Sequence, residues 1–228
     1  MALILNIDTS TYTGSVAISR ENETIISRKL KESQNVSSHL TGLIEQILHE
    51  GNFQIKQLDA IALNIGPGSY TSLRTGMSVA KGMAYALEIP IIGLTAFEIL
   101  LKQAENASED IIMAMIEARR MDVYAQIWKK NENILSEPEF LSLDNSFFEL
   151  YKGQNILCLG DGAIKVASSP EKPKNWKVEE IAQSAHIMAT LASEKYIEKQ
   201  FIDTAYSVPY YFKEPNITQP KHIFIKNT

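Results

Sequence analysis

The chain has 228 residues, of which 45% are apolar and 21% are charged, with a net charge of −5 and a pI near 5.5. This composition excludes a disordered or fibrous protein, and the acidic balance argues against unaided nucleic-acid binding, which relies on Lys and Arg. The single cysteine, Cys158, fits a reducing compartment, and its run NILCLG predicts a buried side chain. No segment approaches the length of a membrane span, so we expect a cytoplasmic protein without membrane contact.

The first half of the chain has the pattern of a strand hairpin followed by helices. Apolar residues 2–7 end at Asp8, the turn-rich TSTYTG follows, and the alternating SVAIS predicts a second strand. A third strand, TIISRKLK, precedes a helix in SSHLTGLIEQILHEG that ends near Gly51. The strand AIALNI, a glycine loop, a helix from about Ser69 to Leu87 and the strand IPIIGL complete this half.

The second half repeats this order. IIMAMI ends at Glu117 and is followed by ARRMD, the strand VYAQIW, the polar turn KKNEN and the strand ILSEPEF. One constant offset places Asp8 on Glu117 and Asn22 on Asn131, and the glycine loop IGPG recurs later as LGDG. The repeat predicts two related lobes that face each other across a cleft.

We therefore predict an α/β fold made of two duplicated β-β-β-α-β-α units. The small, polar segment KQAENASED at 102–110 marks the junction, which gives an N-terminal lobe of residues 1–101 and a C-terminal lobe of residues 102–228. We expect the C-terminal segment to pack back on the first lobe.

The glycine loop has two interpretations. Gly66 and Gly68 allow close backbone approach, and Ser69 is placed to cap the next helix, whose free amides would suit a phosphate. However, the loop lacks the lysine of a G-x-x-x-x-G-K-[ST] motif, and Lys81 lies about three helical turns beyond the cap. The loop alone is therefore weak support for a phosphate site.

The helix after the loop contains two glycines. Gly76 and Gly82 each cost about 1 kcal/mol relative to alanine, which predicts a compensating contact. The stripe expected to face the strands consists of Leu73, Met77, Ala80, Ala84 and Leu87. The adjoining face carries Ser72, Gly76, Val79 and Met83. A glycine on that face would let a second helix approach closely, either the chain's own helix 36–50 or one from another chain.

Several motifs together resemble one known family. They are LNIDTST with SVAIS, GPGSYTSLRTGMSVAKGMAYAL, IIGLTAFEIL, MIEARRMDVYAQIW and a late PYYFK. They resemble the bacterial TsaB family, also called YeaZ, from residue 3 to about 128 and again near the C-terminus. The resemblance implies the RNase H-like fold of actin, Hsp70 and sugar kinases. It also implies a role in forming threonylcarbamoyladenosine next to the anticodon of tRNAs that read codons starting with A.

The resemblance also implies partners. A TsaB-like chain docks through first-lobe helices on TsaD, a catalytic paralogue, and the ATPase TsaE joins them, so that tRNA is reached only through the complex. We place the partner interface on Ser69, Ser72, Arg74, Gly76, Val79, Met83 and His39. Arg74 belongs to this set because the dipole at a helix start repels a cation unless an acidic group lies near. We expect a homodimer through the same helices.

The catalytic paralogue carries a metal-binding His-x-x-x-His pair, which this chain lacks. Asn35 stands four residues before His39, and His49 is about 15 Å further along the same helix, too far to share an ion. His186 and His222 lie in unrelated segments. We therefore expect no catalytic residues, no metal and no protease activity.

Two turns are candidate ligand sites. Asp8, Thr9 and Ser10 occupy the turn that faces phosphates and Mg²⁺ in nucleotide-binding members of this fold. Asp8 and Ser10 also fit hairpin caps, and we favour that interpretation. We expect no cofactor in the isolated chain, and ATP or ADP with Mg²⁺ only within the complex. The counterpart turn carries Glu117, Arg119, Arg120 and Asp122, an ion-pair network or a cleft rim that touches a ligand or partner.

The late aromatic run also has two interpretations. Tyr210, Tyr211 and Phe212 with Lys213 look like a platform for stacking bases, but such residues near a chain end more often pin the tail. Two functions therefore compete at this point. The first is a non-catalytic subunit of the tRNA threonylcarbamoyl transfer machinery, and the second is a stand-alone ATPase or kinase of the same fold, favoured by Asp8 and the two glycine loops.

Overall fold

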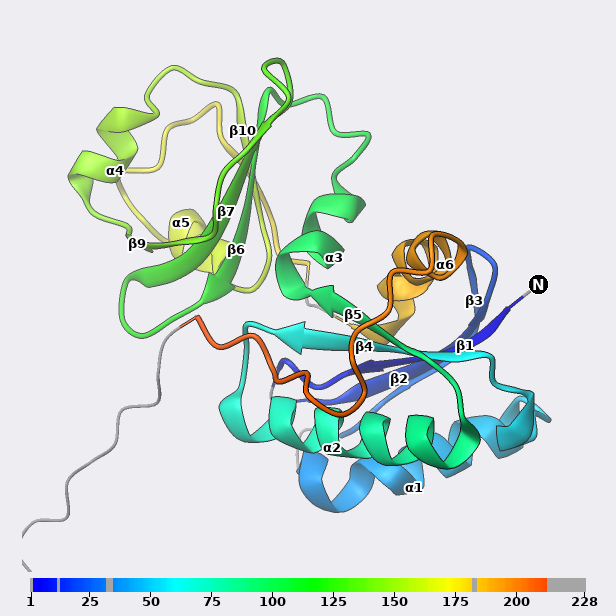
Figure 1. Cartoon of the computed structure of the whole chain (residues 1–228). Helices are drawn as coiled ribbons and strands as arrows, with labels where there is room; N and C mark the ends of the chain where they lie inside the picture. The colour runs from blue at the N-terminus through cyan, green and yellow to red at the C-terminus, as the bar shows by residue number, and fades with distance from the viewer. Residues whose placement is uncertain (1, 12, 32–34, 182–183, 213–228) are drawn as a thin grey trace, which may run out of the picture.

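The computed structural model describes residues 2–11, 13–31, 35–181 and 184–212 (Figure 1). It contains two mixed sheets, ordered β3-β2-β1-β4-β5 and β11-β10-β6-β7-β8, with β9 also paired to β7. The strands of the first sheet are β1 (Leu3–Asp8), β2 (Ser15–Arg20), β3 (Glu23–Lys29), β4 (Ala60–Gly66) and β5 (Ile91–Thr95). Those of the second are β6 (Ile111–Glu117), β7 (Asp122–Lys129), β8 (Ile134–Leu135), β9 (Glu139–Ser142), β10 (Ile156–Leu159) and β11 (Lys177–Glu179).

The two sheets have the same connectivity. β1 pairs antiparallel with β2 and parallel with β4, and β6 pairs antiparallel with β7 and parallel with β10. The predicted two-lobed α/β fold with a duplicated unit is confirmed. One predicted strand, ILSEPEF, is divided into β8 and β9, which both pair with β7.

Two long helices cover one face of the first sheet. The helices and 3-10 turns of the chain are α1 (Val36–Glu50), η1 (Ile55–Gln57), α2 (Tyr70–Leu87), α3 (Ala96–Gln103), α4 (Asn145–Leu150), α5 (Ala163–Ala167), η2 (Ala185–Met188) and α6 (Ala189–Ile197). α1 and α2 lie together below the sheet in Figure 1. The predicted apolar stripe of α2 faces this core, since Leu73, Met77, Ala80 and Ala84 are buried and Leu87 packs partly against it.

Each half contributes a helix that packs against the sheet of the other half. α3 buries Phe97 and Leu100 with residues of β6 and β10, whereas η2 and α6 bury Met188 and Ala192 on the first sheet. Figure 1 shows α3 between the two sheets and α6 above the first. The residue 101/102 boundary therefore falls inside a helix that contacts both sheets.

The second lobe has its own apolar core. Phe147, Phe148 and Trp176 pack together there, with Cys158 fully buried beside them. Burial raises the pKa of the Cys158 thiol to about 12, so this side chain stays a neutral thiol and packs as an apolar core residue. In the parts of the chain that the structure describes, no helix is both long and apolar enough to cross a membrane.

Candidate functional site

The turn after β1 is a buried hydrogen-bond network. Asp8 Oδ1 accepts from the Ser10 amide (2.8 Å), the Ser10 hydroxyl (2.7 Å) and Asn64 Nδ2 (3.2 Å). Asn64 lies near the C-terminal end of the neighbouring parallel strand β4, and its Oδ1 accepts from the Gly66 amide at 3.0 Å. Sequence reasoning missed Asn64, although a polar residue inside the apolar run AIALNI was a usable signal.

The glycine loop covers this network. The Ser69 amide donates to the Ser10 carbonyl at 2.7 Å, and a Cβ at Gly68 would overlap the Ser10 backbone. Asp8, Thr9 and Ser10 are only 1%, 0% and 5% exposed. The turn as arranged therefore does not fit a phosphate group or a hydrated Mg²⁺, because the loop would first have to move.

The Asp8 carboxylate is bonded on one side only. Among the described residues, Asp8 Oδ2 and Thr9 Oγ1 are buried side-chain atoms without a hydrogen-bond partner. Burial raises the pKa of Asp8, and the hydrogen bonds from Ser10 and Asn64 only partly oppose this effect. The bonds from Asn64 to Asp8 and from the Ser69 amide to the Ser10 carbonyl hold this turn against β4 and the glycine loop.

The contact that compensates Gly76 lies within the chain. A Cβ at Gly76 would overlap Thr9 Oγ1, so this buried glycine lets α2 approach the turn after β1. The expectation that Gly76 meets another helix, whether its own or a partner's, is therefore wrong. Periodicity placed Gly76 on a face of α2, but it did not reveal that a loop lies opposite. Val79 and Met83 pack partly against the first core and remain half-buried.

The other residues expected at the partner interface have contacts within the chain. Ser69 is the N-cap residue of α2, but its hydroxyl bonds to the Ser72 hydroxyl at 3.1 Å and caps no amide. Arg74 Nε donates to the Tyr211 hydroxyl at 3.0 Å. The partner of this cation near the start of α2 is thus a tyrosine hydroxyl and not the acidic group that we expected. His39 Nδ1 lies 3.1 Å from the carbonyl of Asn35.

The turn after β6 is held by a lysine. Lys165 Nζ donates to the carbonyls of Ala118 and Asp122, the latter at 3.0 Å, and lies 3.7 Å from Glu117 Oε1. The Glu117 amide donates to Asp161 Oδ1 at 2.9 Å. Sequence reasoning missed Lys165, which follows the second glycine loop on α5.

The other residues of this turn shape it through their backbone. The Asp122 amide donates to the Arg119 carbonyl at 3.1 Å, and Arg120 has a left-handed backbone with φ 57°. Glu117, Arg119 and Arg120 are exposed at the surface, while Asp122 is half-buried. The structure thus brings Glu117 to Lys165 across the turn.

The second glycine loop repeats the crossing made by the first. The Gly162 amide donates to the Met115 carbonyl at 3.1 Å, and a Cβ at Gly162 would lie 2.9 Å from the Ile116 carbonyl carbon. The loop after β10 thus presses against the end of β6, as the loop after β4 presses against the turn after β1. Both glycine loops are packing elements.

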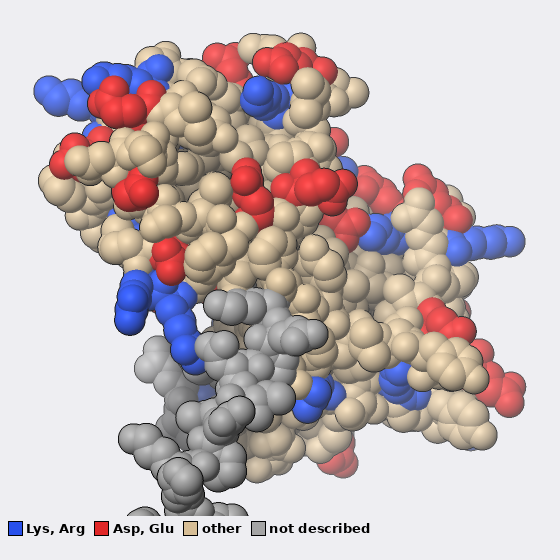
Figure 2. Space-filling view, turned by 60° about the vertical axis from the view of Figure 1, so that its left-hand side comes forward, with Lys and Arg blue, Asp and Glu red and all other residues tan. Residues whose placement is uncertain are grey.

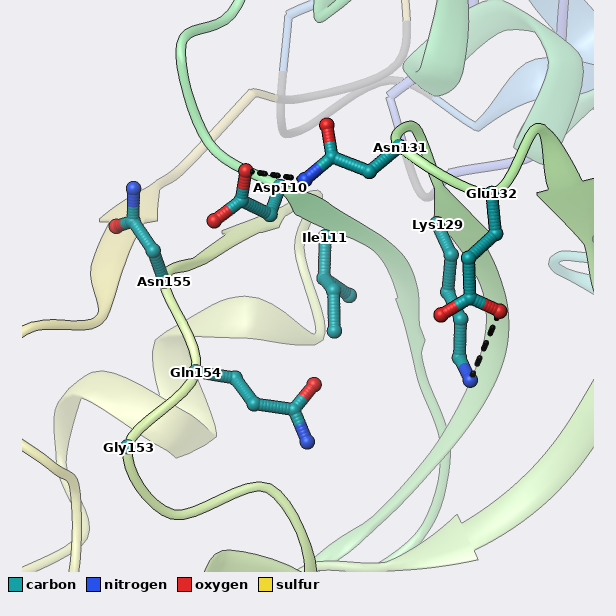
Figure 3. Close-up of a pocket in the computed structure, with 8 residues that line it drawn as sticks. All are labelled: Asp110, Ile111, Lys129, Asn131, Glu132, Gly153, Gln154 and Asn155. Atoms are coloured by element: carbon teal, nitrogen blue, oxygen red, sulfur yellow. Dashed lines mark hydrogen bonds and ion pairs between the residues drawn. The ribbon is translucent and has the colours of Figure 1, made fainter.

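A cavity of about 260 Å³ lies at the other end of β6 (Figure 3). Its lining comprises Asp110, Ile111, Lys129, Asn131, Glu132, Gly153, Gln154 and Asn155, none of which is a predicted site residue. The charged groups are engaged with neighbours, since Asp110 accepts from Asn131 Nδ2 at 2.7 Å and Lys129 lies 3.9 Å from Glu132.

The histidines are dispersed in the described structure. Asn35, which stands four residues before His39, is the N-cap of α1, and its side chain accepts from the Ser38 amide. Over the described ranges, no three His, Cys, Asp or Glu residues are placed to share a metal ion. His222 lies outside the described residues, as do Lys213 and the rest of the tail.

Comparison with known proteins adds the family. Residues 26–193 match the model described as "TsaD: tRNA N6-adenosine threonylcarbamoyltransferase". The chain is 31% identical over 134 residues to the tRNA threonylcarbamoyladenosine biosynthesis protein TsaB of Bacillus subtilis, an alignment that covers 59% of this chain and 58% of that one. It is 29% identical to the Haemophilus influenzae TsaB, covering 92% of this chain and 93% of that one.

A solved structure shows the same fold. "YeaZ from Pseudomonas aeruginosa" superposes with a TM-score of 0.73 at 22% identity, over 92% of this chain and all of that one. The family model spans well over half of the sequence, and the motifs that resemble TsaB lie in both the matched and the flanking parts. The chain therefore belongs to the TsaD-type family of tRNA threonylcarbamoyl proteins and, within it, to the TsaB (YeaZ) group.

Proposed function

We propose that this chain is a non-catalytic, complex-forming subunit of the cytoplasmic machinery that transfers a threonylcarbamoyl group to the adenosine next to the anticodon of tRNAs reading codons that start with A. It acts with a TsaD-like catalytic paralogue and a TsaE-like ATPase. The observation that supports the non-catalytic role is that the chain's own groups occupy both turns. Gly68 and Ser69 cover the first turn, and Lys165 holds the second.

The surface charge supports an indirect contact with tRNA. Figure 2 shows acidic side chains interspersed among the basic ones over the face in view, so the described residues form no continuous basic surface there. Nucleic-acid affinity depends on several Lys or Arg residues that neutralise neighbouring phosphates. We therefore assign tRNA binding to the assembled complex.

The docking surface is best sought on the outer sides of α1 and α2. The contact with Thr9 explains why a glycine stands at position 76. An added Cβ at Gly42 or Gly82, in contrast, would meet no described atom within 4 Å. Each is an exposed helix glycine that costs about 1 kcal/mol, and no contact with another described residue offsets that cost. Tyr85, also on α2, is 84% exposed. We propose that a partner helix, from a TsaD-like chain or a second copy of this chain, covers this surface.

The catalytic assignment is tested by reconstitution. We expect the purified chain alone to transfer no threonylcarbamoyl group to tRNA and to turn over no ATP, whereas addition to the TsaD-like and TsaE-like partners restores transfer. Micromolar ATP binding with turnover by the chain alone would instead favour the stand-alone ATPase.

The docking surface is tested with Gly82→Leu. The variant should unfold no earlier than the unmodified chain, because leucine is a better helix former, yet bind the TsaD-like partner about tenfold more weakly, roughly 1.4 kcal/mol. Glu149→Leu, at an exposed position of α4 in the other lobe, is the control. Equal affinity of the two variants in a calorimetric titration would exclude this surface.

A further inference from the structure

The last described residues form a strap, defined here as residues 203–212, that runs from α6 past α2 toward the second sheet. Figure 1 shows it in orange, crossing in front of β4 and β5 and ending below β7. Lys81 Nζ donates to the Ala205 carbonyl at 2.9 Å, and the Tyr210 amide donates to the Ile65 carbonyl at 2.7 Å. Pro209 between them is buried. The strap is thus attached to the first lobe along its length.

Two consecutive residues at its end contact different lobes. Tyr211 packs on Tyr70 of α2, with ring centroids 4.8 Å apart, and its hydroxyl accepts from Arg74 Nε. Phe212 packs on Tyr124 of β7, with centroids 4.9 Å apart. Because only one planar peptide unit separates the two residues, these contacts tie α2 to β7 through a very short length of chain.

The first-lobe contact is reinforced by Arg74. Its guanidinium carbon lies 4.1 Å from the centre of the Tyr70 ring and 5.8 Å from that of Tyr211. Such a stack combines cation–π attraction with a directional hydrogen bond, so it orients the Tyr211 ring as well as binding it. In the second lobe, the Tyr124 ring also packs on Phe140 of β9, with ring centroids 5.6 Å apart. The row of aromatic rings therefore reaches a second strand of that sheet.

The lobes are joined elsewhere by α3 and α6. Glu98 of α3 pairs with Lys195 of α6 at 2.6 Å, and Lys102 pairs with Glu194 at 2.8 Å. A single region of contact between the lobes would leave the second sheet free to pivot about it. β7 already contacts α3, and Tyr124 packs partly against the α3 core, so the contact of Phe212 with Tyr124 adds a further restraint on this strand.

We propose that Tyr211 and Phe212 are an interlobe clamp that fixes the orientation of the second lobe relative to α2, with Arg74 as the residue that positions Tyr211. The clamp gives the PYYF run a role in both lobes, beyond pinning the tail to one of them. It is independent of the function proposed above, since it concerns the isolated chain.

The test measures the distance between the lobes. Cysteines introduced at Ser78 on α2 and Glu149 on α4, both exposed, carry spin labels, while the buried Cys158 stays unlabelled. We expect Tyr211→Ala and Phe212→Ala to broaden the distance distribution and shift it to longer values. Tyr206→Ala, at a strap tyrosine that is 86% exposed, should leave it unchanged.

Arg74→Lys keeps the charge of an exposed residue and removes only the planar guanidinium, so it remains informative if the aromatic variants fold poorly. It should broaden the distribution while circular dichroism stays unchanged. Faster amide exchange in the strap of Tyr211→Ala, combined with an unaltered interlobe distance in all three variants, would overturn the clamp and leave a local anchor.

Discussion

The turn after β1 is buried, whereas the turn after β6 stays at the surface, although both follow equivalent strands. Asp8 is 1% exposed and bonded to Ser10 and Asn64, while the aligned Glu117 is exposed and lies near Lys165. In the first lobe short side chains and backbone close the turn, and in the second a long side chain does. The repeat therefore conserves a backbone crossing and leaves its surroundings free to differ.

The difference has a physical origin in the helices. α2 has 18 residues and approaches the first turn through Gly76, whereas its counterpart α5 has only 5 residues. A short helix covers less of the sheet and leaves the turn beside it in solvent. Lys165 suits that setting because its stem packs while its ammonium group reaches backbone carbonyls.

The largest expected effect is at the first of the two glycine crossings. Gly68→Ala should destabilise the fold by about 3 kcal/mol, because its Cβ would overlap the Ser10 backbone, which cannot rotate away. Gly162→Ala should cost less, about 1 kcal/mol, because the nearest backbone atoms lie 2.9 to 3.1 Å away. Chemical denaturation measures both, and equal losses would show that the two crossings are equally tight.

The next effect separates the two glycines of α2. Gly76→Ala should lower the free energy of unfolding by about 1 to 2 kcal/mol, because Thr9 is fully buried and has little room to shift. Gly82→Ala, with open space around it, should raise that free energy by up to about 1 kcal/mol. Thermal unfolding of both variants checks the prediction, which fails if Gly76→Ala is as stable as Gly82→Ala.

The smallest effect compares one carboxylate from each lobe as pH changes. Burial raises the pKa of Asp8 above its ordinary 3.8, so its ionisation removes stability as pH rises through 3.8 to the folded pKa. Hydrogen bonds from Ser146 and Phe147 lower the pKa of Asp144, which caps α4, so its contribution is present above 3.8 and is lost as pH falls through the folded pKa.

Replacement by asparagine should therefore give opposite pH slopes. The stability of Asp8→Asn relative to the unmodified chain should rise with pH, and that of Asp144→Asn should fall over the acidic range. Denaturation curves collected between pH 3 and 7 compare them, the range following from the ordinary carboxyl pKa of about 4. Parallel slopes would mean that the buried turn keeps Asp8 as readily ionised as an exposed cap.

Local sequence determined the elements and their order. The offset between the halves predicted equivalent sheets, the apolar spacing of α2 predicted its buried stripe, and the TsaB-like motifs gave the family. Such features are readable because periodicity and turn chemistry act over a few neighbouring residues. The β-branched and apolar side chains in the strand segments add a local preference for extended structure.

Tertiary structure alone decided what lies opposite each face. Thr9 against Gly76, Lys165 against the second turn and Tyr211 against Arg74 all join residues far apart in sequence. A periodic pattern shows which side of a helix is apolar or open, but the identity of the opposing group depends on how the lobes and the strap pack. That packing places Gly76 against Thr9 of the same chain. It also places the adjacent rings of Tyr211 and Phe212 on different lobes.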